Sequence, residues 1–431
     1  MIRRIIISIT AVLLCVAASA QTARELIEQD ITRIGCQLHR YESAYTETAA
    51  PRGYKPFYVS HFSRHGSRCF TGDTYKGAIK VLSRADSLGI LTDEGRSLLR
   101  DITVLRKCQE GRFGALTPLG GREHRGIAER LVDRCPEMFC QEDRKEVLAI
   151  SSTVTRCQES MDNFCAGLAG RNPSVSITTR SDKETDAAIT RIEAGGRSPE
   201  FPGEDDSREQ LRAIMDEVMD VSRMESAFFT DPDRARPLMK KGDSRLFFYE
   251  LIQGITIGQC LDDELPDLYS HFTFDELYGF WLAKNPSTVN THGFTYENGK
   301  VLRRCGKLAL TDILTKADEA VQSGSHKLAD LRFSHDGGVL PLISFLGLEK
   351  NDTARRVRDV SASGWYAFQN IEMATNLQMI FYRNRRGKVL VKFLHNERET
   401  TITALRPYRG PYYRWSELRP YLLNLLEEDC G

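Results

Sequence analysis

A histidine and two arginines lie close together in the stretch "YVSHFSRHGSRCF". His65 stands between Arg64 and Gly66, and Arg68 follows three residues later. A basic surface loop would explain such a stretch without any chemistry. The alternative is a pocket for a phosphate group, in which the arginines bind the oxygens and the histidine attacks phosphorus. The rest of the chain decides between these two interpretations.

Two further places in the chain share one design, in which a predicted strand leads through a short polar loop into a helix. The stretch "LAISSTVTRCQES" brings Arg156 to such a loop, and "LRFSHDGG" brings His335 and Asp336. In open α/β sheets, ligands bind just beyond the carboxyl ends of the strands. Helix N-termini at that edge supply free N–H groups and the positive end of a dipole, which suit an anion. We therefore expect the three loops to meet at one anion site.

The polar side chains of these loops include three guanidinium groups, which would repel one another if they converged. A phosphate group would balance them, because arginine binds phosphate through two parallel hydrogen bonds. The predicted site consists of Arg64, His65, Arg68, Arg156, His335 and Asp336.

The elements that must position these residues follow a simple order along the chain. Strand and helix patterns alternate at both ends of the chain, and the residues between them are mainly helical. This order predicts an α/β fold, with a mostly parallel, doubly wound sheet, helices on both faces and a mainly helical cap inserted in the chain. The predicted core comprises residues 21–160 and 308–431, and the predicted cap comprises residues 161–307.

The net charge of the chain is zero, with 59 basic and 59 acidic residues among 431. This balance gives no support for nucleic-acid or membrane-surface binding through bulk charge, and 41% apolar residues suit a globular core. The first 20 residues differ, because "MIRR" is basic, the following run is apolar, and "ASA" ends at Ala20. They predict a secretory signal peptide cleaved before Gln21, and therefore export to the periplasm or the extracellular space. No later segment is long and apolar enough to span a membrane.

Eleven cysteines are present, and Cys15 lies in the predicted signal peptide. The remaining ten are an even number in an exported chain, which predicts disulfide bonds. Cys135 and Cys140 are close enough in sequence to close a small loop, and Cys260 and Cys305 are a second candidate pair. The sequence contains no C-x-x-C pair, so it does not indicate a cysteine zinc site.

Several other residues have a structural interpretation beside a functional one. His61 and His65 are four apart, as zinc ligands can be, but no glutamate follows His61, so His61 is predicted to be a half-buried strand residue that could support the site. His124 lies in an amphipathic helical pattern and is predicted to be structural. Ser67 either donates a hydrogen bond to phosphate or caps the following helix. Elsewhere, an Asn-Gly pair within residues 294–302 predicts a small hairpin.

The motifs together resemble those of one known family. "SRHGSR" resembles the arginine, histidine and glycine motif of the histidine phosphatase superfamily, and "SHDGG" resembles the His-Asp pair of its acid phosphatase and phytase branch. "TRC" followed by "QES", and "LTPLGGREH", resemble two further motifs, and all stand in the family's order. "REHRGIAERL", "PLISFLGL" and "NLQMIFYR" resemble more closely the multiple inositol polyphosphate phosphatase subgroup. The resemblance covers nearly all of the chain after residue 20.

The resemblance implies a mechanism that uses no metal or other cofactor. His65 would attack phosphorus and form a phosphohistidine, and Asp336 would give a proton to the leaving alcohol and later help to activate water. Surrounding cations favour a neutral, nucleophilic imidazole, and a bound phosphate dianion raises the pKa of Asp336 so that it holds the proton it must donate. The phosphoryl oxygens would be held by Arg64, Arg68, Arg156 and His335.

The sequence departs from the subgroup at the proton donor. Inositol polyphosphate phosphatases usually have His-Ala-Glu, with the acid two places after the histidine, where this chain has Gly337. Here the acid is Asp336, as in phytases and acid phosphatases. We expect a phosphatase whose partner is a phosphorylated small molecule, such as phytate or another inositol polyphosphate. The alternatives are an acid phosphatase of broad specificity and a non-catalytic protein that binds phosphorylated ligands.

Overall fold

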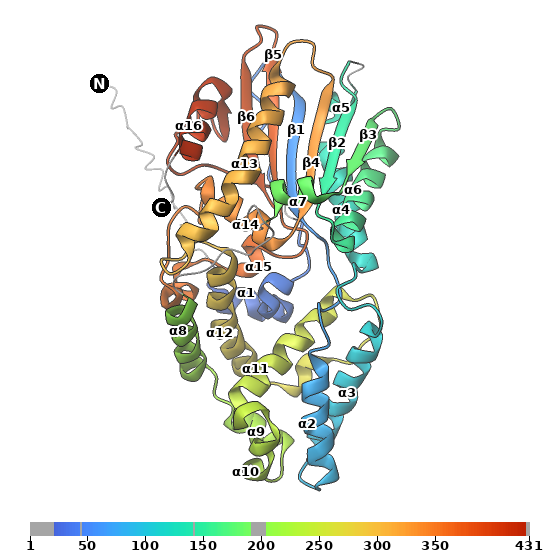
Figure 1. The fold of residues 1–431 in the computed structure, drawn as a ribbon, viewed down its shortest axis with the longest axis vertical. Coiled ribbons are helices and arrows are strands. Elements are labelled where there is room, and N and C mark those ends of the chain that lie inside the picture. Colours follow the sequence, from blue (N-terminus) through green and yellow to red (C-terminus); the bar gives the residue numbers. More distant parts are fainter. Residues whose placement is uncertain (1–20, 44, 141–142, 191–203, 428–431) are drawn as a thin grey trace, which may run out of the picture.

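The structure is a computed structural model that describes residues 21–427, except residue 44, residues 141–142 and residues 191–203. The described residues form one sheet of eight strands: β1 (Tyr54–Arg64), β2 (Glu146–Ser151), β3 (Ser176–Arg180), β4 (Lys327–Ser334), β5 (Asn376–Asn384), β6 (Val389–His395), β7 (Arg398–Thr400) and β8 (Tyr412–Arg414). The strand order is β3-β2-β4-β1-β5-β6-β7, with β8 paired to β6 (Figure 1). The first four of these strands are parallel, and β5 runs antiparallel to β1. The predicted fold class is therefore confirmed.

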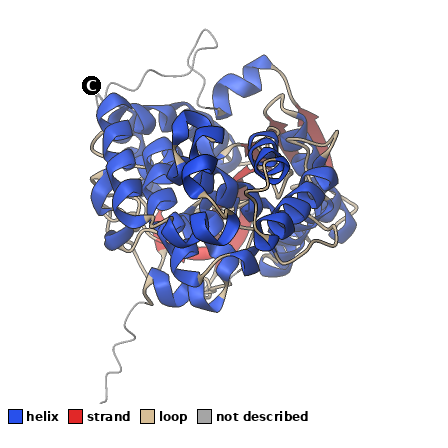
Figure 2. Cartoon of the chain, turned by 90° about the horizontal axis from the view of Figure 1, so that it is seen from below, coloured by secondary structure: helices blue, strands red, loops and turns tan. Residues whose placement is uncertain are grey.

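Helices cover both faces of the sheet, and seen from below they hide most of it (Figure 2). One face packs against α4 (Pro118–Arg134) and α6 (Thr155–Arg171). The opposite face packs against α13 (Gly299–Val321), α14 (Asp336–Phe345) and α16 (Trp415–Glu427). Along β1, Val59 belongs to the first of these layers, and Tyr58 and Phe62 belong to the second. Alternate residues of β1 are buried on opposite faces, as in a doubly wound sheet.

The cap helices lie at the other end of the molecule from the sheet in Figure 1. They are α8 (Glu204–Val218), α9 (Ser222–Phe228), α10 (Pro232–Ala235), α11 (Ser244–Ile255) and α12 (Phe274–His292). Two helices from the predicted core join them, since α2 (Tyr75–Ser87) contacts α11 and α3 (Asp93–Gln109) contacts α9. Conversely, β3 comes from the predicted cap and pairs with β2. Cap and core are thus interleaved along the chain, and the domain boundaries drawn from the sequence stay a prediction.

Short helices complete the described part of the chain. They are α1 (Ala23–Gln29), α5 (Pro136–Phe139), α7 (Lys183–Ile189), α15 (Ala367–Asn370) and the 3-10 helices η1 (Ile31–Leu38), η2 (Arg236–Leu238), η3 (Lys240–Gly242), η4 (Thr256–Cys260), η5 (Leu268–His271), η6 (Val357–Asp359) and η7 (Ser361–Ser363). None of the helices within the described residues has the length and apolar character needed to cross a membrane.

The hairpin predicted over residues 294–302 is wrong. Asn298 directly precedes α13, and the helix begins at Gly299. The side-chain amide of Asn298 donates to Oδ1 of Asn290 in α12 over 2.9 Å. The Asn-Gly pair therefore forms the start of α13, because contact with α12 outweighs the local preference for a hairpin turn.

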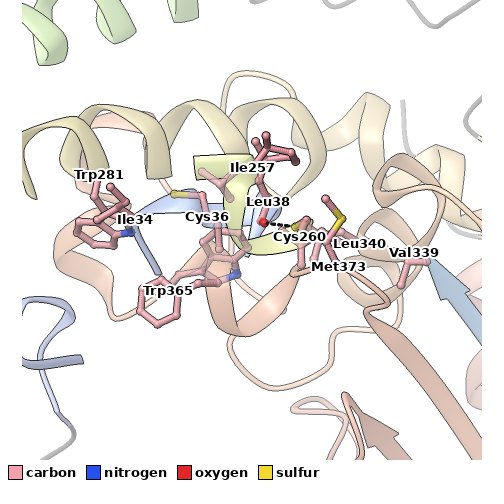
Figure 3. Packing of buried hydrophobic residues seen from close by; sticks show 14 of the residues in the cluster. Ile34, Cys36, Leu38, Ile257, Cys260, Trp281, Val339, Leu340, Trp365 and Met373 are labelled. Carbon is pink, nitrogen blue, oxygen red and sulfur yellow. Dashed lines mark hydrogen bonds between the residues drawn. The ribbon is translucent and has the colours of Figure 1, made fainter. Parts of the chain in front are cut away.

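A buried cluster joins the cap to the core (Figure 3). It contains Leu38 of η1, Trp281 of α12 and Leu340 of α14, none of which is more than 3% exposed. The Cys260 thiol donates to the carbonyl oxygen of Leu38 over 3.3 Å. Helix η1 is thereby held against both parts of the molecule, and its backbone becomes a rigid support for whatever lies beside it.

The predicted disulfide bonds are absent from the described residues, in which nine cysteines are free thiols. Cys135 is buried whereas Cys140 is exposed. The Cys260 thiol is bonded to Leu38, and the Cys305 thiol donates to the carbonyl oxygen of Val301 over 3.4 Å. The two members of the second candidate pair therefore have separate partners, which sequence spacing could not reveal.

Candidate active site

Strands β1 and β4 end side by side, because Arg64 pairs with Ser334 in their parallel register. The next residue of each chain segment is a histidine, and the ring centroids of His65 and His335 are 5.6 Å apart. Strand β2 ends beside β4, and Arg156 lies in the first turn of the helix that follows it. Its Nη2 is 3.4 Å from Nδ1 of His335. The structure thus brings the three predicted loops to one place.

The Arg64 guanidinium is fully buried and is fixed along one edge. Its Nη1 donates to the carbonyl oxygens of Gln37, over 2.5 Å, and of Ile371, over 2.7 Å. Its Nη2 lies 3.2 Å from Oδ2 of Asp336. One edge of the guanidinium therefore has a structural task, whereas the edge formed by Nε and Nη2 faces the proton-donor candidate.

Three arginines of the site have buried N–H groups that lack a partner. The Nε atoms of Arg64, Arg68 and Arg156 have no hydrogen-bond partner within the part of the chain that the structure describes. Burial and the neighbouring Arg64 and Arg156 charges lower the pKa of Arg68 to about 10. Burial likewise lowers the pKa of Arg156. An unsatisfied buried donor costs about 1–3 kcal/mol, so an anion with several oxygens would stabilise this cluster.

His65 presents a nucleophilic nitrogen. Its Nδ1 lies 2.9 Å from the carbonyl oxygen of Gly66, which can only accept, so Nδ1 carries the proton and the lone pair of the neutral ring is on Nε2. Burial, followed by the charges of Arg64, Arg68 and Arg156, holds the pKa of His65 well below its usual value. The imidazole is therefore neutral and able to attack an electrophile.

Asp336 begins α14, and its carboxylate is held at both oxygens. Oδ1 accepts from the backbone N–H of Gly337 over 3.0 Å, and Oδ2 lies 3.2 Å from Arg64 and 3.7 Å from Nε2 of His292. Burial alone would raise the pKa of Asp336, but His292 and Arg64 outweigh it and hold that pKa well below its usual range. The free protein therefore has an ionised carboxylate here. His292 has no signal in the sequence, because only the fold brings the end of α12 to this point.

The loop after His65 packs directly on the start of α4. A Cβ atom added to Gly66 would lie 2.5 Å from the carbonyl oxygen of Gly120, and one added to Gly120 would collide with the carbonyl oxygen of Ser67. The backbone N–H of Gly66 also donates to Oγ of Ser160 over 3.1 Å. Glycine at both positions lets the two backbones touch, and this contact holds the loop that carries His65 against the start of α4.

The hydroxyl proton of Ser67 is used in a bond to Glu123, so Ser67 neither caps a helix nor has this proton left for a phosphate group. Its Oγ and its backbone N–H each donate to a carboxylate oxygen of Glu123, both over 2.7 Å. Glu123 also accepts from the backbone N–H of Tyr41 over 3.0 Å. Burial raises the pKa of Glu123, which is 8% exposed. The sequence could have indicated this role of Glu123 only through its position, since it is an acidic residue on the buried side of the amphipathic helix α4.

We expect Glu123→Gln to weaken this anchor. A glutamine has one acceptor oxygen, so at least one of the three donors around it is left unpaired, at a cost of about 1–3 kcal/mol. Phosphate release should slow about tenfold or more because His65 is no longer held in place. Asp133→Asn, in the exposed ion pair of the same helix with Arg171, is the control. Wild-type rates for Glu123→Gln would contradict the anchoring role.

His61 and His124 are fully buried behind the site, so the prediction that His61 is only half-buried is wrong, because α6 covers this face of β1. The ring of His61 lies 4.7 Å from that of Phe164, and the rings of both histidines lie within 6 Å of Phe333. Burial lowers the pKa of His124 to about 3 and holds that of His61 well below its usual value. Both are neutral core residues that support β1 and β4.

One group of residues could in principle hold a metal ion. Within the described ranges, ligand atoms of Asp30, His39 and Glu42 lie within 4.8 Å of one another. Arg33 lies 3.1 Å from Glu42, and Arg40 lies 3.8 Å from Asp30. Two guanidinium groups already balance the two carboxylates, so this group is an ion-pair network.

The buried carboxyl group of Glu372 predicts how stability depends on pH. It is 1% exposed, and burial raises its pKa to about 8. Because the folded protein binds this proton more tightly than the unfolded chain, its contribution to the free energy of unfolding is fully present below about pH 4 and is lost as the pH rises through about 8. We expect Glu372→Gln to flatten this decline in urea unfolding. Glu417→Gln, at an exposed position, is the control. Equal declines in wild type and Glu372→Gln would contradict the assignment.

The site as a whole combines a histidine with a free Nε2, three arginines and a carboxyl group at the carboxyl edge of an α/β sheet. That combination is suited to an enzyme acting on phosphate esters. The sequence profile described as histidine phosphatase superfamily (branch 2) matches residues 58–396. The chain belongs to this family and is a phosphatase, a hydrolase of phosphate monoesters.

Solved structures share the fold. The multiple inositol polyphosphate phosphatase of Bifidobacterium longum is 18% identical, and the match covers 90% of this chain and 97% of that chain. Its TM-score is 0.72 in the complex with inositol hexasulfate and 0.73 in the complex with phosphate. The phytase from D. castellii is 15% identical, with 92% and 85% of the two chains covered and a TM-score of 0.67. No curated protein sequence matches the chain.

Proposed function

We propose that the chain is an exported phosphatase that hydrolyses an inositol polyphosphate, such as phytate, through a phosphohistidine. The observation that carries this proposal is a set of three buried Nε groups around the site, on Arg64, Arg68 and Arg156, which have no partner among the described residues. A phosphoryl group offers three oxygens to these donors and neutralises the charges that repel one another.

In the first half-reaction, Nε2 of His65 forms a bond to phosphorus while the bond between phosphorus and the leaving oxygen breaks. The three arginines stabilise the charge on the equatorial oxygens, and His335, beside Arg156, completes their surroundings. Asp336 gives its proton to the leaving alcohol oxygen. The phosphoryl dianion raises the pKa of Asp336 by drawing on the same cations that keep it ionised in the free protein.

In the second half-reaction, a water molecule attacks the phosphohistidine. The carboxylate of Asp336 accepts a proton from this water, the bond between nitrogen and phosphorus breaks, and inorganic phosphate leaves. When phosphate leaves, Asp336 releases this proton to solvent and returns to the carboxylate of the free protein, and the next phosphate dianion that binds raises its pKa so that it takes up a proton again. His65 is neutral again, so the complete cycle consumes only the phosphate ester and water.

The substrate class is supported by the structural neighbours. The Bifidobacterium longum enzyme is described as a multiple inositol polyphosphate phosphatase, and the D. castellii protein is described as a phytase. Export is supported by the basic, apolar and small-residue pattern of residues 1–20, which lie outside the described residues.

A substrate panel tests this function. We expect purified protein to release phosphate at acidic pH without added metal, with kcat/KM for phytate at least about tenfold above that for sugar phosphates and phosphotyrosine. Similar values for all substrates would instead identify an acid phosphatase of broad specificity. Binding of phytate without turnover would identify a non-catalytic phospholigand-binding protein. Loss of activity on treatment with a chelator would contradict the metal-free mechanism.

A further inference from the structure

The cap places a histidine beside the proton donor Asp336. His292 is the last residue of α12, and its Nε2 lies 3.7 Å from Oδ2 of Asp336. The end of α12 packs on α14, since a Cβ added to Gly293 would lie 3.5 Å from a methyl group of Leu340, an ordinary van der Waals distance. The side chain of His292 is 15% exposed. Its position beside the carboxylate is therefore set by the packing of two helices.

The same helix also supports the opposite partner of that carboxylate. Thr288, one turn before His292, donates from Oγ1 to Oε1 of Gln37 over 2.7 Å. The backbone carbonyl oxygen of Gln37 in turn accepts from Nη1 of Arg64. Oδ2 of Asp336 is flanked by His292 and Arg64. Helix α12 carries His292 and supports Arg64 through Gln37.

Substrate binding changes these two neighbours differently. Nη1 of Arg64 is committed to two backbone carbonyl oxygens, so a phosphoryl group can use only Nε and Nη2, and Nη2 is the atom that faces Asp336. A phosphoryl group at that edge competes with Asp336 for Arg64. His292 comes from the cap helix rather than from the arginine cluster, so we expect it to remain beside Oδ2.

We propose that His292 is a positioning residue that shares one proton with Asp336, so that this cap residue supplies the proton that Asp336 donates. An imidazolium beside a carboxylate and a neutral imidazole beside a carboxylic acid are two forms of the same pair. Passing between them breaks the N–H bond at Nε2 of His292 and forms the O–H bond at Oδ2 of Asp336. This inference rests on the proposed function.

The surroundings of the pair define its dependence on pH. Asp336 also faces charged or titratable groups at the end of β1, at the end of β4 and on α6, and these are Arg64, His65, Arg68, His335 and Arg156. They favour the carboxylate, and a bound phosphate dianion opposes them. Interacting groups lose protons as a unit, so the pair retains its shared proton to a higher pH than the carboxyl group would alone.

The experiment compares the pH profiles of kcat for wild type and His292→Gln. With a poorly leaving alkyl phosphate, we expect the alkaline limb of the variant to move about one unit or more to lower pH. With an activated nitrophenyl phosphate, which needs little help from an acid, the two profiles should nearly coincide. Thr291→Ala, at an exposed position next to His292, should match wild type in both assays. His292→Ala should regain activity on the alkyl phosphate when imidazole is added.

Unchanged alkaline limbs, or a shift of the limb to higher pH, would overturn the inference, because His292 would then act only as a fixed charge or a structural residue. Such a result, with an active wild-type enzyme, would leave the proposed function intact. An inactive wild-type protein would overturn the proposed function and this inference with it. If His292→Gln fails to fold, as seen by thermal unfolding, recovery of His292→Ala by imidazole supports the inference, and lack of recovery opposes it.

Discussion

Replacement of His65 by alanine is expected to lower kcat by at least about a thousandfold, because no other group in the site can take its place as the nucleophile. In the described site the imidazole of His65 is neutral beside the charges of Arg64, Arg68 and Arg156, and its Nδ1 is bonded to Gly66, so Nε2 is left to attack phosphorus. In wild type, rapid quenching at alkaline pH should trap labelled phosphate on the protein. In His65→Ala this labelled species should be absent, although binding of inorganic phosphate should persist because the arginines remain.

A suitable control for this experiment is His326→Ala. His326 is exposed, and its ring is bonded only to the carbonyl oxygen of Asp143 among the contacts that the structure shows. Its loss should leave turnover unchanged. Substantial residual turnover in His65→Ala, with trapped phosphate still present, would mean that a different residue is the nucleophile.

The second large effect is expected for Asp336→Asn. An asparagine retains the oxygen that accepts from Gly337 but has no proton to give, so the leaving alkoxide must depart unprotonated. We expect kcat to fall at least about a hundredfold for alkyl phosphates and far less for nitrophenyl phosphate. A series of leaving groups, plotted as log kcat against the pKa of the alcohol, should show a steeper slope for the variant.

Asp275→Asn is the matched control, because this aspartate is 80% exposed and pairs with Arg24 at the surface, away from the site. It should give the wild-type slope. Equal slowing of all leaving groups in Asp336→Asn would argue that the residue orients the site and does not donate the proton.

The arrangement of the sheet could be anticipated from the sequence, because strands and their following loops have local signals. The residues Arg64, His335 and Arg156 each follow a run of strand-forming residues, and parallel strands bring their carboxyl ends to one edge. The register that pairs Arg64 with Ser334 then places the two histidines beside each other. Local pattern and global fold agree at these positions.

The failures have a common physical cause. The local sequence at Asn298 predicts a hairpin turn, but its amide is bonded to Asn290 of α12. The local sequence at Ser67 predicts a helix cap or a phosphate contact, but its hydroxyl is bonded to Glu123. His292 has no local signal, since its role depends on the end of a cap helix reaching the first residue of α14. The spacing of cysteines along the chain does not show where their side chains point, and the thiols of Cys260 and Cys305 have separate partners. Contacts between distant segments decide all of these cases.

The touching backbones of Gly66 and Gly120 limit how this enzyme can be redesigned. Neither position can gain a methyl group, and neither can shrink to make room for the other, since glycine has no side chain to lose. No pair of compensating substitutions therefore exists at this contact. A directed-evolution library for new substrates should hold both glycines constant and vary the cap, apart from Thr288 and His292, which support Arg64 and Asp336.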